Sequence, residues 1–269
     1  MAEAVKAAVG GAMAESDIHN KWVSTYRTAE AQAFYEMAFD EVVRRLNAPK
    51  DAIILDAGCG SCAKSVLLAK RGFRVTGSDF SQKALDLAVD TIQAHGVADR
   101  ISLQREDLTG LSFPNGTFKY AICWGVLMHV PDVQKALSEL SRVLAPGGQL
   151  VLSEGNMYSL QAVALRGLRR LLRKGRATVV RTPVGMEAHE DTSQGKLLTR
   201  ETDMSWLVAE ADRLGLRLKA RIAGQFTELY AIAPWQPAKR LIHTLNRLWF
   251  RHVGAAGPAF ANILILEKR

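Results

Sequence analysis

Short apolar runs alternate with helix-length amphipathic stretches through the middle of this 269-residue chain. The apolar runs predict strands at residues 53–56, 74–79, 101–106, 120–124 and 149–153. Between them, apolar residues at helical spacing predict helices at 63–71, 81–95 and 132–144, and Ser81 is the expected N-cap of the second. Because strands separated by helices pair in parallel through right-handed crossovers, this order predicts an α/β fold with a doubly wound, mostly parallel sheet.

The flanking segments complete this sheet and add to it. Further elements are predicted at 22–46 (helix), 202–214 (helix), 217–222 (strand), 239–252 (helix) and 262–267 (strand), which brings the sheet to seven strands. Residues 156–200 are too long for a tight crossover and begin with an Arg-rich helix. We therefore expect an N-terminal helical lid at 1–50 and a main domain at 51–269, with a helical insertion at 156–200 after strand five.

The formal charge of +8 is unevenly distributed along the chain. Residues 1–154 hold 16 Lys and Arg against 18 Asp and Glu, whereas residues 155–269 hold 19 against 9, so the two parts carry −2 and +10. An excess of this size concerns partners rather than fold, and it favours an anionic substrate, an anionic lipid surface or a nucleic acid.

Three cysteines, Cys59, Cys62 and Cys123, form no even disulfide framework, and no second pair of ligands accompanies the first two to make a zinc site. We therefore expect no metal. The Ala-rich N-terminus is interrupted by charged residues and glycines, and no stretch approaches the length of about 18 apolar residues that a membrane span requires. The sequence thus favours a cytoplasmic protein.

The most specific local feature is a glycine turn that joins the first predicted strand to its helix. Gly58, Gly60 and Ala63 satisfy the G-x-G-x-x-A pattern of dinucleotide-binding folds, in which glycines let a ligand approach the backbone closely. Asp56 distinguishes two ligand classes, because a carboxylate there would repel a pyrophosphate. The same carboxylate would attract the sulfonium and α-ammonium of S-adenosylmethionine.

Acidic residues also follow the next two strands. Asp79 ends the second strand, nineteen residues beyond Gly60, where a carboxylate accepts hydrogen bonds from ribose hydroxyls. Asp107 follows the third strand, where it could accept from an adenine amine. Since ligands of open α/β sheets bind at the carboxyl ends of the strands, three acids in succession there predict a nucleoside-containing ligand.

Four blocks of sequence resemble the class I S-adenosylmethionine-dependent methyltransferase family, particularly its small-molecule branch. They are LDAGCG at Leu55–Gly60, GSDFS at Gly77–Ser81, FPNGTFKYAICWGVLMHVPD at Phe113–Asp132 and LSRVLAPGGQLVLSE at Leu140–Glu154. Together they cover roughly residues 50–155, and their order and spacing are more specific than any one block. The resemblance implies a Rossmann-like sheet, with residues 262–267 as an antiparallel strand at its edge, and S-adenosylmethionine as the methyl donor.

The resemblance also assigns roles to single residues at the donor. Asp56, Gly58 and Gly60 would line its methionine and ribose part, and Asp79 would hold the ribose hydroxyls. The others implied to contact the donor are Phe80 on the adenine, Asp107 and Leu108 at its edge, Trp124 closing the pocket, and Tyr26 in the N-terminal lid. The chain departs from the family at Cys62, where many members have a third glycine.

Methyl transfer from a sulfonium is an in-line displacement, so the protein mainly aligns the reactants and excludes water. A base is needed only where the acceptor must lose a proton. His129, just beyond the fourth strand, is the first candidate for this base, and its alternative role is to shape the pocket wall. His189, among acids in the inserted segment, is the second candidate, with a solvated loop as its alternative.

Two other functions are compatible with the glycine turn. A nicotinamide-dependent oxidoreductase is disfavoured by Asp56 and by the lack of a Tyr-x-x-x-Lys pair placed for hydride transfer. A donor-binding partner that has lost transfer activity would keep the same acids, because binding and turnover need different residues. The leading prediction is methyl transfer to oxygen, nitrogen or carbon of a small-molecule, anionic or lipid-like acceptor.

Two helices of the basic half place cations and leucines on separate faces. The cations are Arg166, Arg169, Arg170 and Arg173 on one helix and Arg240, His243, Arg247 and Arg251 on the other. Such helices suit the periphery of an anionic membrane, whereas the simpler alternative packs the leucines on the sheet and leaves the arginines solvated. Nucleic acid is not an expected partner, because no recognised RNA- or DNA-binding module is present.

Overall fold

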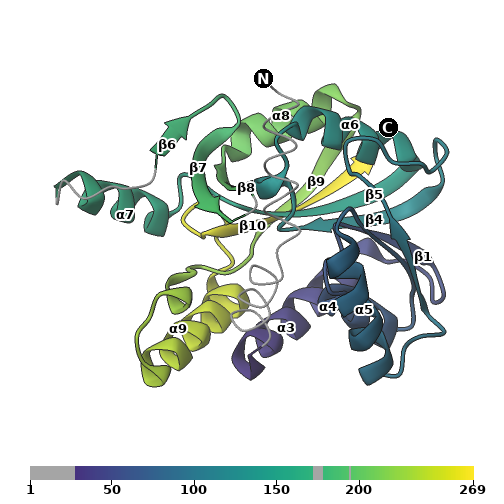
Figure 1. Ribbon diagram of the computed structural model, residues 1–269, viewed down its shortest axis with the longest axis horizontal. Coiled ribbons are helices and arrows are strands. Elements are labelled where there is room, and N and C mark those ends of the chain that lie inside the picture. The colour runs from purple at the N-terminus through teal and green to yellow at the C-terminus, as the bar shows by residue number, and fades with distance from the viewer. Residues whose placement is uncertain (1–27, 172–177, 194) are drawn as a thin grey trace.

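The computed structural model describes residues 28–171, 178–193 and 195–269 (Figure 1). A twisted central sheet is built from β1 (Ile53–Ala57), β2 (Arg74–Asp79), β3 (Ile101–Arg105), β4 (Phe118–Trp124), β5 (Leu144–Gly155), β9 (Leu216–Ala223) and β10 (Ala261–Lys268). The strand order is β3-β2-β1-β4-β5-β10-β9. The first five strands pair in parallel, and β10 is antiparallel to both of its neighbours. The predicted seven-stranded, mostly parallel α/β sheet is therefore confirmed.

The antiparallel strand does not lie at the sheet edge, as the resemblance implied for residues 262–267. It lies between β5 and β9, and four successive side chains, Ile263 to Leu266, are buried because both faces of the strand are covered. The edge is instead β9, whose exposed positions carry the cations Arg217, Lys219 and Arg221. Charged side chains on an edge strand discourage pairing with another chain.

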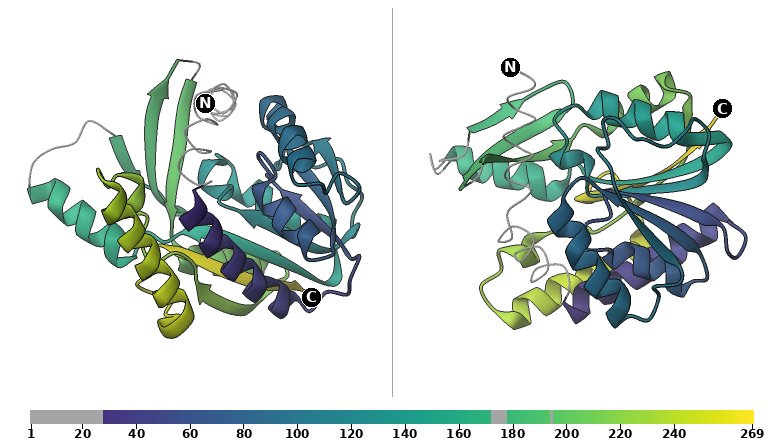
Figure 2. Two further views of the ribbon diagram at one scale, coloured as in Figure 1. Left: turned by 90° about the horizontal axis from the view of Figure 1, so that it is seen from below. Right: turned by 45° about the vertical axis from the view of Figure 1, so that its right-hand side comes forward.

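Helices cover both faces of the sheet, which is what a doubly wound arrangement requires (Figures 1 and 2). One face carries α3 (Ala29–Leu46), α4 (Ala63–Lys70) and α5 (Gln82–Ala94), and the other carries α6 (Val133–Val143) and α8 (Met204–Arg213). Successive strand residues contribute to opposite apolar layers: Ile54 packs with the first group of helices and Leu55 with the second. Ser81 caps α5 as predicted, accepting a hydrogen bond from the Ala84 amide.

The described part of the N-terminal segment is α3, which packs directly on the sheet. Thr28 caps this helix, and its buried residues include Phe34, Tyr35 and Phe39. Asn47, in the left-handed conformation, ends it. The lid function predicted for residues 1–50 depends on Tyr26, which lies outside the described residues, so this function stays a prediction.

The inserted segment contains more than the helix that the sequence predicts. It begins with α7 (Leu160–Leu171) and continues as a three-stranded antiparallel sheet, β6 (Thr178–Arg181), β7 (Gly185–Thr192) and β8 (Gly195–Thr202). These strands are not predicted from the sequence because β7 has the sequence GMEAHEDT, in which acids and a histidine stand where β-branched residues are usual. This small sheet projects beyond the central sheet (Figure 2).

The basic helix near the C-terminus turns its leucines toward solvent, whereas the simpler alternative from the sequence packs them on the sheet. It comprises α9 (Gln236–Leu248) and a short π-helical continuation, η3 (Trp249–Val253), and the turn η2 (Leu229–Ala231) precedes it. The residues of α9 that turn inward are the polar His243 and Asn246, whereas Leu241, Leu245 and Leu248 are exposed. The leucines therefore do not pack on the sheet.

Within the described part of the chain, no helix combines the length and the apolar composition needed to cross a membrane.

Candidate active site

The carboxyl ends of β1, β2, β4 and β5 meet at one edge of the central sheet, because these strands run parallel (Figure 1). Asp56 and Asp79 lie at the ends of β1 and β2 at this edge, and the segments that follow the strands carry Gly58, Gly60 and His129. The edge is therefore where the sequence places the donor and the reacting groups.

The glycine turn is held against the end of β2 by its own backbone. The amides of Gly58 and Cys59 both donate to the Ser78 carbonyl, at 2.8 and 2.9 Å. Gly58 and Gly60 both have positive φ, of +77° and +53°. A Cβ on Gly58 would lie 2.5 Å from a methyl group of Val126, whereas a Cβ on Gly60 would meet no atom within 4 Å. Gly58 thus permits close internal packing, and the backbone at Gly60 is open to a ligand.

We expect Gly58→Ala to lower the free energy of unfolding by about 2–4 kcal/mol, from the positive φ and the overlap with Val126 together. Gly60→Ala is the matched control, since it has the same backbone cost but no overlap and should lose only about 1–2 kcal/mol. Urea denaturation measures both. Equal losses in the two variants would show that the contact with Val126 plays no part.

Cys62 occupies the position where many proteins of the resembled family have a third glycine, and its backbone adopts a conformation typical of glycine. It has a φ of +61°, in the left-handed region that glycine favours, and it is fully buried at the N-cap of α4. Its thiol lies beside that of Cys59, whose pKa is raised by a hydrogen bond to Cys62 and by burial. Both buried thiols therefore serve as small packing groups.

Asp79 closes the same turn from the end of β2. Its Oδ2 accepts from the Gly60 amide at 2.9 Å, and its Oδ1 accepts from the Ser81 amide at 2.9 Å. These two bonds orient the carboxylate at the end of β2. The side chain is half-buried at the ligand-binding edge, which is the position predicted for a group that holds a ribose.

Asp56 is more deeply placed than Asp79. Its Oδ2 accepts from the Ser65 hydroxyl at 2.6 Å, and burial raises its pKa to about 6 against the effects of Ser65 and Lys64. Ser65 lies in the first turn of α4, so Asp56 links β1 to the helix that follows the glycine turn. Its predicted contact with the donor stays a prediction.

The residues predicted to surround the adenine lie around the same edge. Asp107 is exposed after β3 and accepts from the amide and hydroxyl of Thr109, and Leu108 beside it is buried. Phe80 is half-buried after β2. Trp124, at the end of β4, packs at 5.0 Å between ring centres on Phe39 of α3. The structure thus brings these four residues to the predicted edge, and their contacts with a donor stay predictions.

His129 lies in η1 (Leu127–His129), the short turn that follows β4. Its Nδ1 is 2.7 Å from the Leu198 carbonyl of β8, and because a carbonyl only accepts, Nδ1 must carry the proton. This bond sets the neutral tautomer whose lone pair is on Nε2. Burial, the largest influence, lowers the pKa of His129 below its usual range, so the ring is neutral at pH 7.

Two buried ionisable residues, Glu154 and Arg200, hold η1 from opposite sides. Glu154, at the end of β5, accepts from the Leu127 and Met128 amides at 3.0 and 3.1 Å. Arg200 of β8 donates through one nitrogen to the Leu127 and Val130 carbonyls, at 2.7 and 3.0 Å. Together they fix the backbone that carries His129.

Arg200 and Glu154, the two residues that hold η1, also interact with ionisable groups around them. Arg200 is fully buried and pairs with Glu187 of β7 at 2.9 Å. Burial raises the pKa of Glu154 to about 8, while the amide donors and Arg200 favour its charged form. The inserted segment therefore reaches into the site through Arg200 as well as through the Leu198 carbonyl.

His189, the second candidate base, is on β7 opposite Leu198, with its Nε2 4.0 Å from Glu187. It is thus a neighbour of Arg200's partner, and the structure places it on the small sheet rather than in a loop. Tyr26 lies outside the described residues. Among the residues that the structure describes, no three or more His, Cys, Asp or Glu side chains are grouped so that they could hold a metal ion.

Sequence analysis missed Glu154 and Arg200 as site residues. Glu154 could have been found by the rule that identified Asp56 and Asp79, since it too is an acid that follows an apolar strand. Arg200 gave no such signal, because it lies in a polar stretch and its partners are 13 to 73 residues away.

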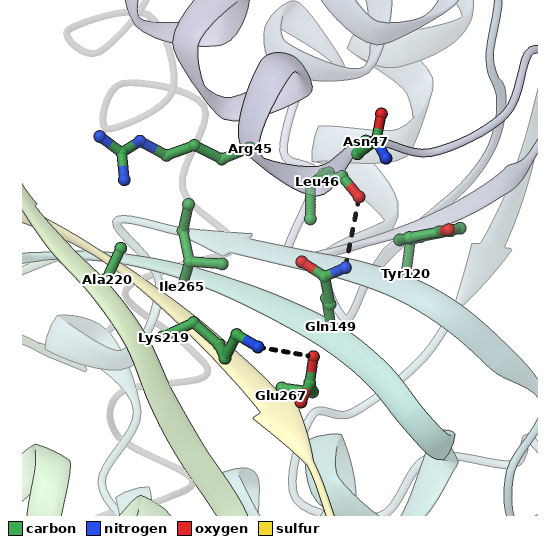
Figure 3. A pocket seen from close by; sticks show the side chains of 9 residues that line it. All are labelled: Arg45, Leu46, Asn47, Tyr120, Gln149, Lys219, Ala220, Ile265 and Glu267. Atoms are coloured by element: carbon green, nitrogen blue, oxygen red, sulfur yellow. Dashed lines mark hydrogen bonds and ion pairs between the residues drawn. The ribbon is translucent and has the colours of Figure 1, made fainter.

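A separate hollow of about 450 Å³ lies at the opposite edge of the central sheet, beside the last turn of α3 (Figure 3). Across it, Gln149 donates to the Leu46 carbonyl and Lys219 pairs with Glu267 at 3.3 Å. The hollow lies toward the amino ends of β4 and β5, whereas the candidate active site lies at their carboxyl ends, so the two are separate.

Comparison with known proteins agrees with this geometry. Residues 54–148 match a family model described as a methyltransferase domain. A demethylmenaquinone methyltransferase of Bacillus licheniformis is 33% identical over 118 residues, which are 43% of this chain and 50% of that protein. A ubiquinone biosynthesis O-methyltransferase of Coxiella burnetii is 34% identical over 103 residues, 38% of this chain and 43% of that protein. The matched region thus spans half the length, or less, of these curated relatives.

Solved structures extend the likeness to nearly the whole chain. Magnesium protoporphyrin IX methyltransferase from Synechocystis, crystallised with bound SAH, superposes with a TM-score of 0.65 and 16% identity, covering 97% of this chain and 99% of that one. At this identity the likeness shows the fold, and it includes the parts of the chain outside residues 54–148. The chain therefore carries a methyltransferase domain at residues 54–148 and has the fold of solved S-adenosylmethionine-dependent methyltransferases.

Proposed function

We propose that the protein transfers a methyl group from S-adenosylmethionine to an oxygen, nitrogen or carbon atom of a small-molecule acceptor. The observation that carries this proposal is the junction of the glycine turn with Asp79, where the Gly60 amide meets the carboxylate at 2.9 Å. This junction combines an open backbone with an acid at the carboxyl ends of β1 and β2, which suits a ribose-bearing cation.

The residues at this edge fit the donor. A Cβ at Gly60 would meet nothing within 4 Å, so the turn has room for a ligand against its backbone. Asp79 would hold the ribose hydroxyls, and Phe80, Asp107 and Leu108 would bound the adenine. When bound, S-adenosylmethionine supplies a methyl group already activated on sulfur. The match of residues 54–148 to a methyltransferase domain supports this donor over a nicotinamide.

The chain's own contribution is to position the acceptor, exclude water and remove a proton where the acceptor has one to lose. His129 is neutral at pH 7 and carries its lone pair on Nε2, which is the state required of a general base. Glu154 and Arg200 keep η1 in place, so the backbone that carries the imidazole is fixed at the edge of the sheet.

The acceptor is expected between η1 and the inserted segment, because β8 contacts η1 directly through Leu198 and Arg200. The two curated relatives are named for menaquinone and ubiquinone synthesis, and the solved structure is named for a magnesium porphyrin. These names support an acceptor with a large apolar or aromatic part for this chain as well.

Binding and transfer assays test the proposal. Calorimetry should detect S-adenosylhomocysteine binding and no comparable binding of NADH. Tritiated donor should label an organic-soluble product when phenolic, quinol, amine and carbon-acid acceptors are offered. Preferential binding of NADH would favour the oxidoreductase, and binding of S-adenosylhomocysteine without any label transfer would favour a donor-binding partner.

We expect His129→Asn to lower kcat by about 10²–10⁴-fold while donor affinity stays within about twofold. The asparagine amide can still donate toward the Leu198 carbonyl, but it has no basic nitrogen. Wild-type kcat should fall at acid pH with a midpoint below 6.5, because the burial of His129 lowers its pKa, and the variant should lose this limb.

His189→Ala is the matched control, and it should leave kcat nearly unchanged if His129 alone is the base. An equal loss of donor affinity and of kcat in His129→Asn would contradict the role of base and assign His129 to the pocket wall.

A further inference from the structure

A stripe of apolar side chains on α9 faces solvent. Leu241, Leu245 and Leu248 are 71%, 42% and 52% exposed, and Ile232, Trp235 and Val253 extend the stripe at its two ends with exposures of 72%, 64% and 55%. We call these six residues the α9 face. Single exposed leucines are common, but three at i, i+4 and i+7 with an exposed tryptophan form a continuous surface, which marks an interaction site.

The orientation of α9 is fixed by polar contacts on its opposite side. Asn246 accepts from the Thr227 amide and donates to the Thr227 carbonyl, both at 2.9 Å, and it is fully buried. The ring of His243 stacks on that of Tyr230 with 4.2 Å between centres. Because these contacts would be lost if the helix turned, the leucines cannot rotate inward, and their exposure is a property of the fold.

Cations border the α9 face, and no acid lies within it. Arg240, Arg247 and Arg251 follow one another at i, i+7 and i+11 alongside the leucines, and the chain has no Asp or Glu between Glu228 and Glu267. Arg240 pairs with Glu30 of α3 at 3.3 Å. Arg247 and Arg251 have no carboxylate partner among the described residues. A face of apolar residues with cations at its border is complementary to a negatively charged, partly apolar surface.

A second apolar helix lies at the same end of the molecule. Leu160, Val163 and Leu168 of α7 are also exposed. The start of α7 is tied to the chain around α9, since the Leu160 amide donates to Pro258 and Gln161 accepts from the Glu228 amide. Figures 1 and 2 show both helices on this side of the central sheet.

The α9 face also stands next to the active-site edge. Because β10 is antiparallel to both β5 and β9, β9 runs parallel to β5, and its carboxyl end lies at the edge that carries His129. The segment that leads from β9 to α9 begins at that end. A surface bound by α9 would therefore lie beside the entrance to the proposed acceptor site.

We propose that the α9 face docks on an anionic lipid bilayer, with its leucines and Trp235 in the interface and Arg247 and Arg251 at the headgroups. Docking itself does not depend on the proposed function. Its consequence does, because an apolar acceptor could then be taken directly from the bilayer. A bilayer fits better than a protein partner because the face is helical, bordered by cations and free of acids, which are the features of interfacial helices.

Sedimentation with lipid vesicles, in the absence of acceptor, tests the docking. The full-length protein should bind phosphatidylcholine vesicles that contain about 30% phosphatidylglycerol, and binding should weaken several-fold without the anionic lipid or at about 0.5 M salt. Leu241→Glu with Leu245→Glu should weaken binding by about tenfold or more, because two apolar side chains no longer enter the interface. Arg247→Glu with Arg251→Glu should weaken it to a similar extent.

Val89→Glu and Lys83→Glu are matched controls, since both residues are exposed and belong to α5, which lies away from α9 (Figure 1). They should bind vesicles as the wild type does. All variants should keep the melting temperature and the affinity for S-adenosylhomocysteine, which separates a failure of docking from a failure of the proposed function.

Three outcomes would overturn the proposal: no binding by the wild type, equal binding by the leucine variant, or indifference to anionic lipid and salt. A stable dimer in solution that Leu241→Glu with Leu245→Glu dissociates, without vesicle binding by the wild type, would also overturn it and assign the α9 face to a second copy of the chain.

Discussion

Replacement of Arg200 by methionine is expected to lower the free energy of unfolding by about 3–5 kcal/mol, the usual result of removing one partner of a buried ion pair. The change leaves the Glu187 carboxylate and the Leu127 and Val130 carbonyls without their shared donor. Since η1 then loses two of the hydrogen bonds that fix its backbone, kcat should fall more than donor affinity does. Urea denaturation and steady-state kinetics measure the two effects.

Arg213→Met is the matched control for this prediction. Arg213 also pairs with a glutamate, Glu210, but its own side chain is largely exposed and the pair lies within one helix, so the loss should stay below about 1 kcal/mol. If Arg200→Met were as mild as this control, Arg200 would not hold η1, and the link between the inserted segment and the site would be wrong.

Asp79→Ala should weaken donor binding by about 100-fold or more. The variant removes a carboxylate that would accept two ribose hydroxyls, and each hydrogen bond to a charged group contributes about 1.5–3 kcal/mol. It also removes the acceptor of the Gly60 and Ser81 amides, which loosens the turn itself. Calorimetry with S-adenosylhomocysteine measures the affinity directly.

Asp79→Asn separates the two parts of this effect. The amide keeps one oxygen that can accept from a turn amide, so the fold of the turn should be better preserved while the charge is lost. His129→Asn provides the comparison, because it should hardly change donor affinity. A smaller loss in Asp79→Ala than in His129→Asn would reverse the assignment of donor and acceptor sides.

The sequence predicts the donor half of the molecule well because its signals are local. The turn from Asp56 to Ala63 is encoded by adjacent glycines, and Asp79 is found from its place at the end of a strand. The strands and helices between residues 53 and 155 follow from short-range periodicity, and each is confirmed within a few residues.

The acceptor half depends on contacts between distant residues, which periodicity does not report. The amphipathic pattern of α9 predicts buried leucines, but the two hydrogen bonds between Asn246 and Thr227 place the polar side of the helix inward instead. The strand β7 forms from a polar sequence because it pairs on both sides and because Arg200 is paired with its Glu187. In both cases a few buried polar contacts override the local preference.

The bond from His129 to the Leu198 carbonyl has a consequence for chimeras made between proteins of this fold. The imidazole follows β4 in the central sheet, but the atom that selects its tautomer is supplied by the inserted segment. Exchange of residues 156–202 for a foreign insertion is therefore expected to change the tautomer of the proposed base as well as the choice of acceptor. Chimeras that keep the backbone position of Leu198 against η1 and an arginine at position 200 are the ones expected to retain their rate.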